Sequence, residues 1–175
     1  MPESWEWVRL GDVCQPFRYG TSAKSAKVGK VPVLRMGNIQ NGEIDWSNLV
    51  YTSDESEIEK YILEKYDLLF NRTNSRELVG KTAIYRAEWP AIFAGYLIQV
   101  KPILSDSSFV NFIMNSEYGR NYCKCVKSDG INQSNVNAQK LGNYPIPLPP
   151  LSEQKRIVGK LEELLPLCYK LAVLN

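Results

Sequence analysis

The segment from Pro145 to Pro150 constrains the fold of this chain more than any other feature. Its four prolines fix φ and remove four backbone donors, so the segment must be extended and cannot join the centre of a sheet. Ser152 is a favourable N-cap, and Glu153 puts negative charge in the first turn of the helix that it predicts. No capping box forms, because Lys155 stands where Glu or Gln is needed. The sequence therefore predicts a stiff, extended segment that leads directly into a helix.

The predicted C-terminal helix carries an apolar seam. Its apolar residues alternate at spacings of four and three, which is the a/d pattern of a two-helix coiled coil. The seam residues are Ile157, Leu161, Leu164, Cys168 and Leu171, with Asn175 next in the register. The alternative is an amphipathic helix that packs on its own domain. Pro166 removes the hydrogen bond to the Glu162 carbonyl and predicts a kink under either interpretation.

The composition predicts one soluble globular domain with little else. The chain has 175 residues, of which 44% are hydrophobic and 23% are charged. No apolar run is long enough to span a membrane and the N-terminus lacks a signal-peptide pattern, so we expect a cytoplasmic location and no membrane partner. The four cysteines show neither a disulfide framework nor the spacing of a zinc site.

The chain contains no histidine, which removes the commonest general base and the usual metal ligand. No glycine-rich cofactor loop is present either. Catalysis could still use Asp, Glu or Lys, but these absences disfavour an enzyme, and we expect no catalytic residues, no metal site and no cofactor.

The net charge of +2 is uninformative, but the charges are segregated along the chain. Residues 13–42 are basic without a single acid, residues 43–67 carry eight carboxylates against two lysines, and residues 118–128 are basic again. This pattern suggests one face for a polyanion and another for solvent or a basic partner. The Gly- and Ser-rich segment 18–30 reads as a mobile basic loop that could lie along a phosphate backbone, or as an ordinary solvated loop.

The secondary-structure pattern predicts an α+β fold. Strands are expected near residues 5–10, 31–36, 67–70, 82–85 and 92–100, where β-branched and aromatic residues gather. Asn41-Gly42 predicts a hairpin turn, and Asp54 predicts the cap of a short acidic helix that ends at Tyr61. Residues 106–126 look helical with an interruption at Gly119. We interpret residues 1–150 as one domain and residues 151–175 as a spacer and dimerisation helix.

Two polar clusters contain the side chains that read DNA. Residues 71–76 hold two arginines, two asparagines and two hydroxyls, and residues 127–137 repeat this chemistry after a basic helix end. Arginine reads guanine through two hydrogen bonds, asparagine and glutamine read adenine, and hydroxyls serve phosphates or bases. The alternative is a pair of polar turns whose side chains bond their own backbone.

Several segments carry a family resemblance, and they occur in order along nearly the whole chain. They are Trp7–Val13, Val33–Ile39, Tyr66–Thr73, Gly80-Lys81, Asn132–Asn137 and the final stretch PIPLPPLSEQKRIVGKLEELL. Together they resemble one half of the specificity subunit of type I restriction–modification enzymes. The resemblance implies a strand-rich target recognition domain followed by a spacer helix. This chain holds one such half, so it is either a fragment or a half-length subunit that pairs with a second copy.

The resemblance also implies a function and partners. We expect double-stranded DNA, a methyltransferase subunit, a restriction and translocase subunit reached through it, and a second half or second copy paired through the C-terminal helix. The rival interpretation is a protein-interaction adaptor with an incidental basic loop. The candidate DNA-binding residues are Arg18, Tyr19, Lys24, Lys27, Arg35, Asn38, Arg72, Asn74, Arg76, Lys127, Asn132, Gln133 and Asn135.

Overall fold

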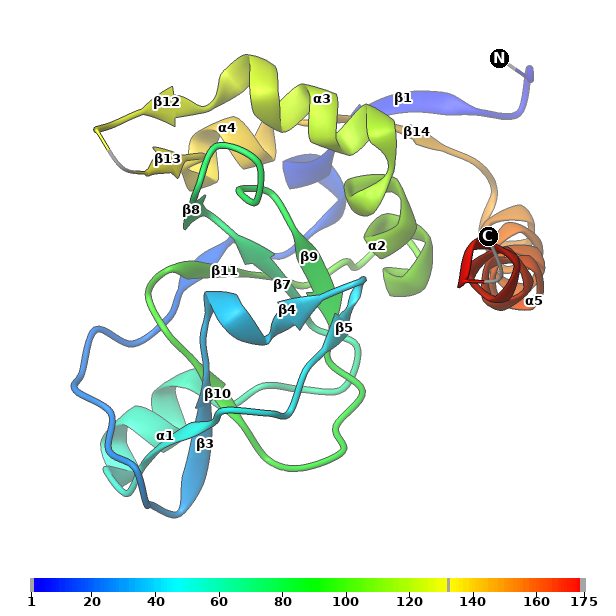
Figure 1. The fold of residues 1–175 in the computed structure, drawn as a ribbon. Helices are drawn as coiled ribbons and strands as arrows, with labels where there is room; N and C mark the ends of the chain where they lie inside the picture. The colour runs from blue at the N-terminus through cyan, green and yellow to red at the C-terminus, as the bar shows by residue number, and fades with distance from the viewer. Residues whose placement is uncertain (1, 132, 174–175) are drawn as a thin grey trace.

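A six-stranded sheet forms the centre of the molecule (Figure 1). The structure is a computed structural model that describes residues 2–131 and 133–173, and within the last helix it describes side chains up to Cys168 and at Lys170. All neighbouring strands of this sheet are antiparallel except β5, which runs parallel to β9. In spatial order the strands are β2 (Arg18–Tyr19), β11 (Leu97–Val100), β7 (Leu68–Asn71), β9 (Thr82–Ile84), β5 (Glu43–Ile44) and β4 (Ile39–Gln40).

Three smaller sheets surround the central one. The first pairs β10 (Ile92–Phe93), β3 (Val31–Leu34) and β6 (Val50–Thr52); the second pairs β12 (Ser128–Asp129), β13 (Ser134–Asn135) and β8 (Thr73–Asn74); the third is a ribbon of β1 (Glu6–Arg9) and β14 (Pro145–Leu148). The helices are α1 (Glu55–Tyr61), α2 (Ser107–Asn115), α3 (Glu117–Val126), α4 (Ala138–Gly142) and α5 (Leu151–Val173), with short 3₁₀ helices at Leu10–Val13 and Met36–Asn38. None of these described helices is long and apolar enough to cross a membrane.

Strand β7 is buried on both faces, because successive side chains of a strand point to opposite sides of the sheet. Leu68 and Phe70 pack with Val110 and other residues of the cluster beneath α2 and α3. Leu69 points to the opposite face, where it joins the cluster that contains Phe93. The continuous apolar run of β7 follows from this double burial.

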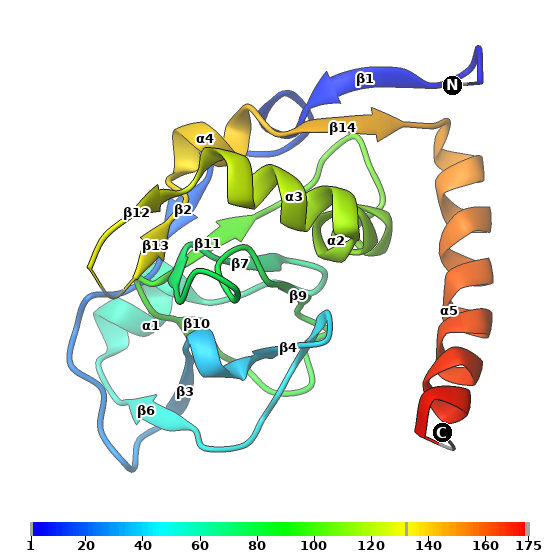
Figure 2. The ribbon, with the colours of Figure 1, turned by 45° about the horizontal axis from the view of Figure 1, so that its top comes forward.

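Helix α5 stands on one side of the body, and the β8-β12-β13 sheet lies on the opposite side (Figures 1 and 2). The β1-β14 ribbon runs along the body and leads into α5 (Figure 2). Its pairing explains how a proline-rich strand is tolerated. Pro145 and Pro147 stand opposite Arg9 and Trp7 in a ribbon of only two strands, so their missing donors break no central ladder.

The α+β prediction is confirmed, and two local predictions hold in detail. Asn41 and Gly42 adopt φ of 52° and 83° and join β4 to β5, as the hairpin turn predicted. Asp54 caps α1, because its side chain accepts hydrogen bonds from the backbone N–H groups of Ser56 and Glu57. The division of the chain at residue 150 stays a prediction.

The predicted start of the C-terminal helix was wrong, and the kink predicted at Pro166 stays a prediction. Helix α5 begins at Leu151, so Ser152 lies inside its first turn, and the Pro150 carbonyl accepts the N–H groups of Glu153 and Gln154 at 2.9 and 3.0 Å. The helix continues past Pro166, which lies inside it.

The predicted helix over residues 106–126 is interrupted at Ser116 rather than at Gly119. Ser116 is extended, and its Oγ caps α3 by accepting the N–H of Gly119 at 3.2 Å. Gly119 is buried inside α3, where a Cβ would lie 2.3 Å from the carbonyl oxygen of Met114. The glycine therefore allows the two helices to approach closely and does not break either one.

The different surroundings of two helical glycines predict opposite effects of alanine substitution on stability. Gly119→Ala should lower the free energy of unfolding by roughly 1–3 kcal/mol, because the added methyl group must displace the Met114 carbonyl. Gly159→Ala is the matched control within α5, where no atom lies within 4 Å of the added Cβ. It should raise the free energy of unfolding by up to ~1 kcal/mol through helix propensity. Urea unfolding of both variants checks the pair, and equal effects would contradict it.

Candidate nucleic-acid interface

Arg72 is held in place by three segments that are far apart in sequence. It lies between β7 and β8, and its guanidinium carbon stacks 4.7 Å from the ring centroid of Tyr19. Its Nη1 donates to the carbonyl oxygen of Gly95 at 3.2 Å, and its backbone N–H donates to the carbonyl of Tyr96. The Tyr19 hydroxyl in turn accepts the N–H of Ala138 at 3.0 Å. The arginine is therefore oriented before any ligand arrives, and its Nη2 forms no hydrogen bond among the described residues.

The two polar clusters predicted from the sequence lie side by side in the β8-β12-β13 sheet. Asn135 pairs with Thr73 in the strand register, and its Nδ2 donates to the Thr73 Oγ1 at 2.7 Å. Asn74 accepts the N–H of Ser75 through its Oδ1 at 2.8 Å. These bonds engage the Oδ1 of Asn74 and the Nδ2 of Asn135, so the opposite ends of the two amides remain to serve as a donor and an acceptor.

We call Tyr19, Arg72, Asn74, Tyr96 and Asn135 the Arg72 surface. Strands β2, β8 and β13, which carry Tyr19, Asn74 and Asn135, lie on the side of the body away from α5 (Figures 1 and 2). Asn135 pairs with Thr73, which stands between Arg72 and Asn74, so strand alternation puts its amide on the face of the small sheet opposite to that of Asn74. Guanidinium and amide groups of these kinds contact base edges in a DNA groove.

Two other predicted contacts, Lys127 and Arg76, lie beside the carboxylate of Asp129. Lys127 donates to Asp129 at 2.8 Å and to the Ser134 Oγ at 3.3 Å, and its side chain is largely buried. Arg76 is exposed, and its Nε lies 3.9 Å from the same carboxylate. The hydrogen bonds from Lys127 and Ser134 hold the pKa of the Asp129 carboxyl below its usual value. Lys127 is thus occupied by an internal ion pair, whereas Arg76 can turn toward a ligand.

The basic loop and the acidic helix are neighbours, and the prediction of separate faces for them was wrong. Thr21 donates to Glu57, and Lys30 forms an ion pair with Glu55, so residues 21–30 are fastened to α1 at both ends. Lys24 and Lys27 lie between these anchors and are exposed. They form no ion pair with any residue that the structure describes. The two lysines therefore remain the cations of this loop that can meet a phosphate.

Three predicted DNA contacts are used for internal structure. Arg18 is separated from Tyr19 by the alternation of β2 and donates to the Lys60 carbonyl at the end of α1. Arg35 donates to the Asn48 carbonyl at 2.8 Å. Asn38 is only 3% exposed.

The Asn38 amide is fully engaged inside the protein. Its Nδ2 donates to the carbonyls of Asp45 and Ser47 at 2.8 and 2.9 Å, and its Oδ1 accepts the N–H of Arg35 at 2.9 Å. In this conformation no part of the amide remains to read a base. Gln133 is exposed, and Asn132 lies outside the described residues.

Sequence reasoning missed Tyr96, which belongs to the Arg72 surface and is 50% exposed. It stands opposite Arg72 one residue beyond the β7-β11 ladder, in which Asn71 pairs with Leu97. Asn71, which the polar cluster includes, is fully buried and faces the core. The sequence feature that could have identified Tyr96 is the Gly95-Tyr96 pair between two apolar strands, because a glycine there indicates a turn and the next residue is aromatic.

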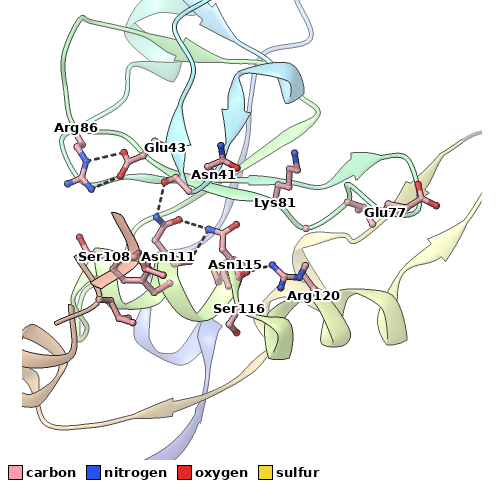
Figure 3. A pocket seen from close by; sticks show the side chains of 17 residues that line it. Asn41, Glu43, Glu77, Lys81, Arg86, Ser108, Asn111, Asn115, Ser116 and Arg120 are labelled. Atoms are coloured by element: carbon pink, nitrogen blue, oxygen red, sulfur yellow. Dashed lines mark hydrogen bonds and ion pairs between the residues drawn. The ribbon is translucent and has the colours of Figure 1, made fainter. Parts of the chain in front are cut away.

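A cavity of about 490 Å³ lies away from the Arg72 surface, among the β4-β5 hairpin, α2 and α5 (Figure 3). Its polar groups bond one another. Asn111 donates to the Gly42 carbonyl, Asn115 both accepts from and donates to the backbone of Thr82, and Arg86 pairs with Glu43 at 2.6 Å. The Asn111 bond attaches α2 to the hairpin, and the Asn115 bonds attach α2 to β9, so these polar groups serve the fold.

Helix α5 uses one face to pack on the body and exposes another. Gln154 is 1% exposed, accepts the N–H of Asp106 and donates to the Pro149 carbonyl, both at 2.8 Å. Val158 is buried below it, and Leu161 lines the cavity further along the helix. Leu164, a predicted seam residue, is 42% exposed. Packing on the body therefore covers part of the apolar stripe and leaves the seam residues Leu164 and Cys168 exposed. The side chain of Leu171, and Asn175, lie outside the described residues.

Burial in the core shifts the pKa values of several titratable groups. Burial raises the pKa of Cys14 to about 12 and the pKa of Cys123 to about 11, so both thiols stay protonated at neutral pH. Burial also raises the pKa of the Asp67 carboxyl, which accepts hydrogen bonds from Gln99 and the Glu64 N–H. Among the described residues, no three metal-ligating side chains gather into a site.

Comparison with known families decides the classification. The family model described as "Type I restriction modification DNA specificity domain" matches residues 2–171. The chain belongs to this family. The match confirms the resemblance found in the sequence, and it does not favour the adaptor interpretation.

Relatives within the family are longer than this chain. A putative type I restriction enzyme MjaX specificity subunit of Methanocaldococcus jannaschii is 33% identical over 170 residues, covering 93% of this chain and 40% of the relative. The type I restriction enzyme EcoAI specificity subunit of Escherichia coli is 30% identical over 180 residues, covering 98% of this chain and 30% of the relative. The chain thus spans less than half of either relative.

Solved structures share the fold. A chain from a study of complex assembly and conformational transition of the type I R-M system superposes with a TM-score of 0.76 at 22% identity, covering 98% of this chain and 40% of that one. The HsdS subunit from Thermoanaerobacter tengcongensis gives a TM-score of 0.73 at 21% identity, with 98% and 40% coverage. At this identity the likeness establishes the fold alone.

The engaged amide of Asn38 predicts a structural role for this residue. Asn38→Ala should lower the free energy of unfolding by roughly 1–3 kcal/mol, because the carbonyls of Asp45 and Ser47 lose their donor. Asn121→Ala, an exposed position on α3, is the matched control and should change stability little. Urea unfolding measures both. An Asn38→Ala variant as stable as the control would return Asn38 to the list of candidate DNA contacts.

Proposed function

We propose that this chain recognises one part of a split DNA target within the specificity subunit of a type I restriction–modification enzyme. The observation that carries the proposal is the fixed orientation of Arg72 by Tyr19 and Gly95, two residues before Asn74 on a chain segment that pairs with the strand of Asn135. A guanidinium that is oriented before binding loses less entropy when it pairs with guanine. The family match supports DNA as the ligand.

The candidate contacts divide by chemistry. Arg72 is assigned to a guanine edge, and Asn74 and Asn135 to neighbouring base edges. Lys24 and Lys27 are assigned to phosphates, because they are exposed on a loop and carry charge without a planar fork. Arg76 is available for either role. The chain itself carries out no reaction and brings its partner's methyltransferase to the target.

The partners follow from the exposed seam of α5 and from the length of the relatives. The seam supports pairing with a second helix, supplied either by a second copy or by the other half of a longer subunit. A helix pair holds two recognition domains apart as a rigid spacer, because each residue adds ~1.5 Å of rise. We assign the methyltransferase subunit as the direct protein partner and the restriction subunit as an indirect one. A self-paired chain would read an interrupted palindrome.

Selection from a random duplex pool tests the proposal. The chain is mixed with its methyltransferase subunit at physiological salt, and bound DNA is sequenced. A split motif with symmetric halves would support a self-paired specificity subunit, and a single enriched half would support recognition by one domain. No enrichment while the protein partner still binds would overturn the assignment to DNA.

Arg72 and Lys24 should affect DNA binding in different ways. Arg72→Ala should cost ~1–3 kcal/mol of binding free energy and relax preference at one base position, because it removes a bidentate contact. Lys24→Ala should lower the binding affinity for all DNA sequences alike, and it should reduce the slope of log K against log salt concentration by about one. Fluorescence titrations on selected and scrambled duplexes, repeated at several salt concentrations, separate the two effects.

Arg120→Ala is the matched control for these titrations. Arg120 lines the cavity beside α5 (Figure 3), away from the Arg72 surface. Its removal should leave both affinity and preference unchanged. If Arg72→Ala behaves like Arg120→Ala, the recognition surface lies elsewhere.

The exposed part of the α5 seam predicts self-association. Leu164→Glu should convert a dimer to a monomer in sedimentation at micromolar concentration, because it puts a charge into the helix contact. The substitution should not unfold the chain, since Leu164 is exposed. Glu163→Ala lies one position away on another face of α5 and should leave the mass unchanged. A wild-type chain that is already monomeric would exclude the second copy as the partner.

A further inference from the structure

Tyr96 is an exposed aromatic residue on a turn that backbone hydrogen bonds hold rigid. Gly95 N–H donates to the Thr21 carbonyl at 2.8 Å, and Leu97 N–H donates to the Ala94 carbonyl at 2.9 Å. The Tyr96 carbonyl accepts the N–H of Arg72 at 3.1 Å. Half of the tyrosine is nevertheless exposed. The fold thus fixes the backbone of Tyr96 firmly and leaves its ring outside the core.

The surroundings of Tyr96 combine apolar and polar surface. Its side chain lines a hollow of about 420 Å³ together with Met36 and Arg35. Met36 begins the 3₁₀ helix that Asn38 fastens to the 45–48 loop, so this wall of the hollow is also fixed. Arg72 donates its backbone N–H to the Tyr96 carbonyl and its Nη1 to the Gly95 carbonyl at 3.2 Å, so the guanidinium lies beside the turn that carries Tyr96.

If an aromatic ring lies on a surface that contacts base edges, the DNA offers few apolar groups for it to pack against. In the major groove, where each base pair shows a distinct pattern, the C5-methyl group of thymine is the apolar feature of the base edges. Burying one methyl group is worth about 0.8 kcal/mol, or about fourfold in affinity. The position of the ring beside the oriented arginine suits it to a base pair adjacent to the one that Arg72 contacts.

We propose that Tyr96 reads a thymine through its C5-methyl group, next to the guanine that Arg72 reads. The inference rests on the proposed function and adds to it a contact that requires no hydrogen bond. Tyr96 thereby selects a T·A pair by apolar contact while Arg72 selects a G·C pair by polar contact. The tyrosine hydroxyl plays no part in the selection, so Tyr96→Phe should behave as the wild type does.

The test replaces thymine by uracil, which removes only the methyl group. Targets selected with the wild-type chain and its methyltransferase subunit are synthesised with deoxyuridine at one thymine at a time. Uracil at the position next to the guanine for which Arg72→Ala loses its preference should lower the affinity of the wild type and of Tyr96→Phe about fourfold. Tyr96→Ala should bind the thymine and uracil targets equally and should lose its preference for T·A at this position.

Tyr66→Ala is the matched control, because Tyr66 is 49% exposed and lies at the other end of β7. It should keep the wild-type response to uracil. The inference is overturned if no uracil substitution changes the affinity of the wild type, or if uracil lowers the affinity of the wild type and of Tyr96→Ala equally. In either case the proposed function stands as long as the base preference still depends on Arg72. No sequence preference in the wild type would overturn both.

Discussion

The double burial of strand β7 is the constraint on which the rest of the structure depends. Leu68 and Phe70 pack into one core and Leu69 into the other, so β7 can neither slip by one residue nor rotate without exposing its apolar side chains. Its last residue, Asn71, is still buried, and Arg72 is the first residue to leave the core. The position of the arginine is therefore set by the packing of the strand before it. Tyr19 and Gly95 then set the direction of its side chain.

Local chemistry in the sequence was enough to predict much of the secondary structure. Asn41-Gly42 specified its turn through positive φ, and Asp54 specified the start of α1 through its short acceptor side chain. The strand that contains Asp67–Phe70 was evident from its apolar run. Ser152 was misleading, because the Pro150 carbonyl already receives the first helical hydrogen bonds. Gly119 was also misleading, since a glycine that permits close packing looks in sequence like one that ends a helix.

The site was harder to predict than the fold, because the use of a polar side chain depends on contacts distant in sequence. Nothing around Asn38 indicates that its amide holds a loop seven to nine residues further on. The charge pattern separated the basic loop from the acidic helix along the chain, yet ion pairing brought them together in space. The polar clusters at residues 71–76 and 127–137 look alike in residue type, but the sequence did not indicate that they lie together, because only the pairing of β8 with β13 unites them.

The candidate DNA-binding surface carries few free positive charges, which gives a physical reason for the proposed recognition domain to act in pairs. Glu55 neutralises Lys30, and Asp129 offsets Lys127 and Arg76, so few cations remain for phosphates. Phosphate contacts supply much of the affinity of DNA-binding proteins, and a domain with few of them binds weakly by itself. Joining two such domains through a rigid helix pair makes the second binding event intramolecular, which raises affinity by ~10²–10⁴ without any new contact. Helix α5 exposes Leu164 and stands on the side of the body opposite to the β8-β12-β13 sheet, so it can provide that joining while the recognition surface stays unobstructed (Figures 1 and 2).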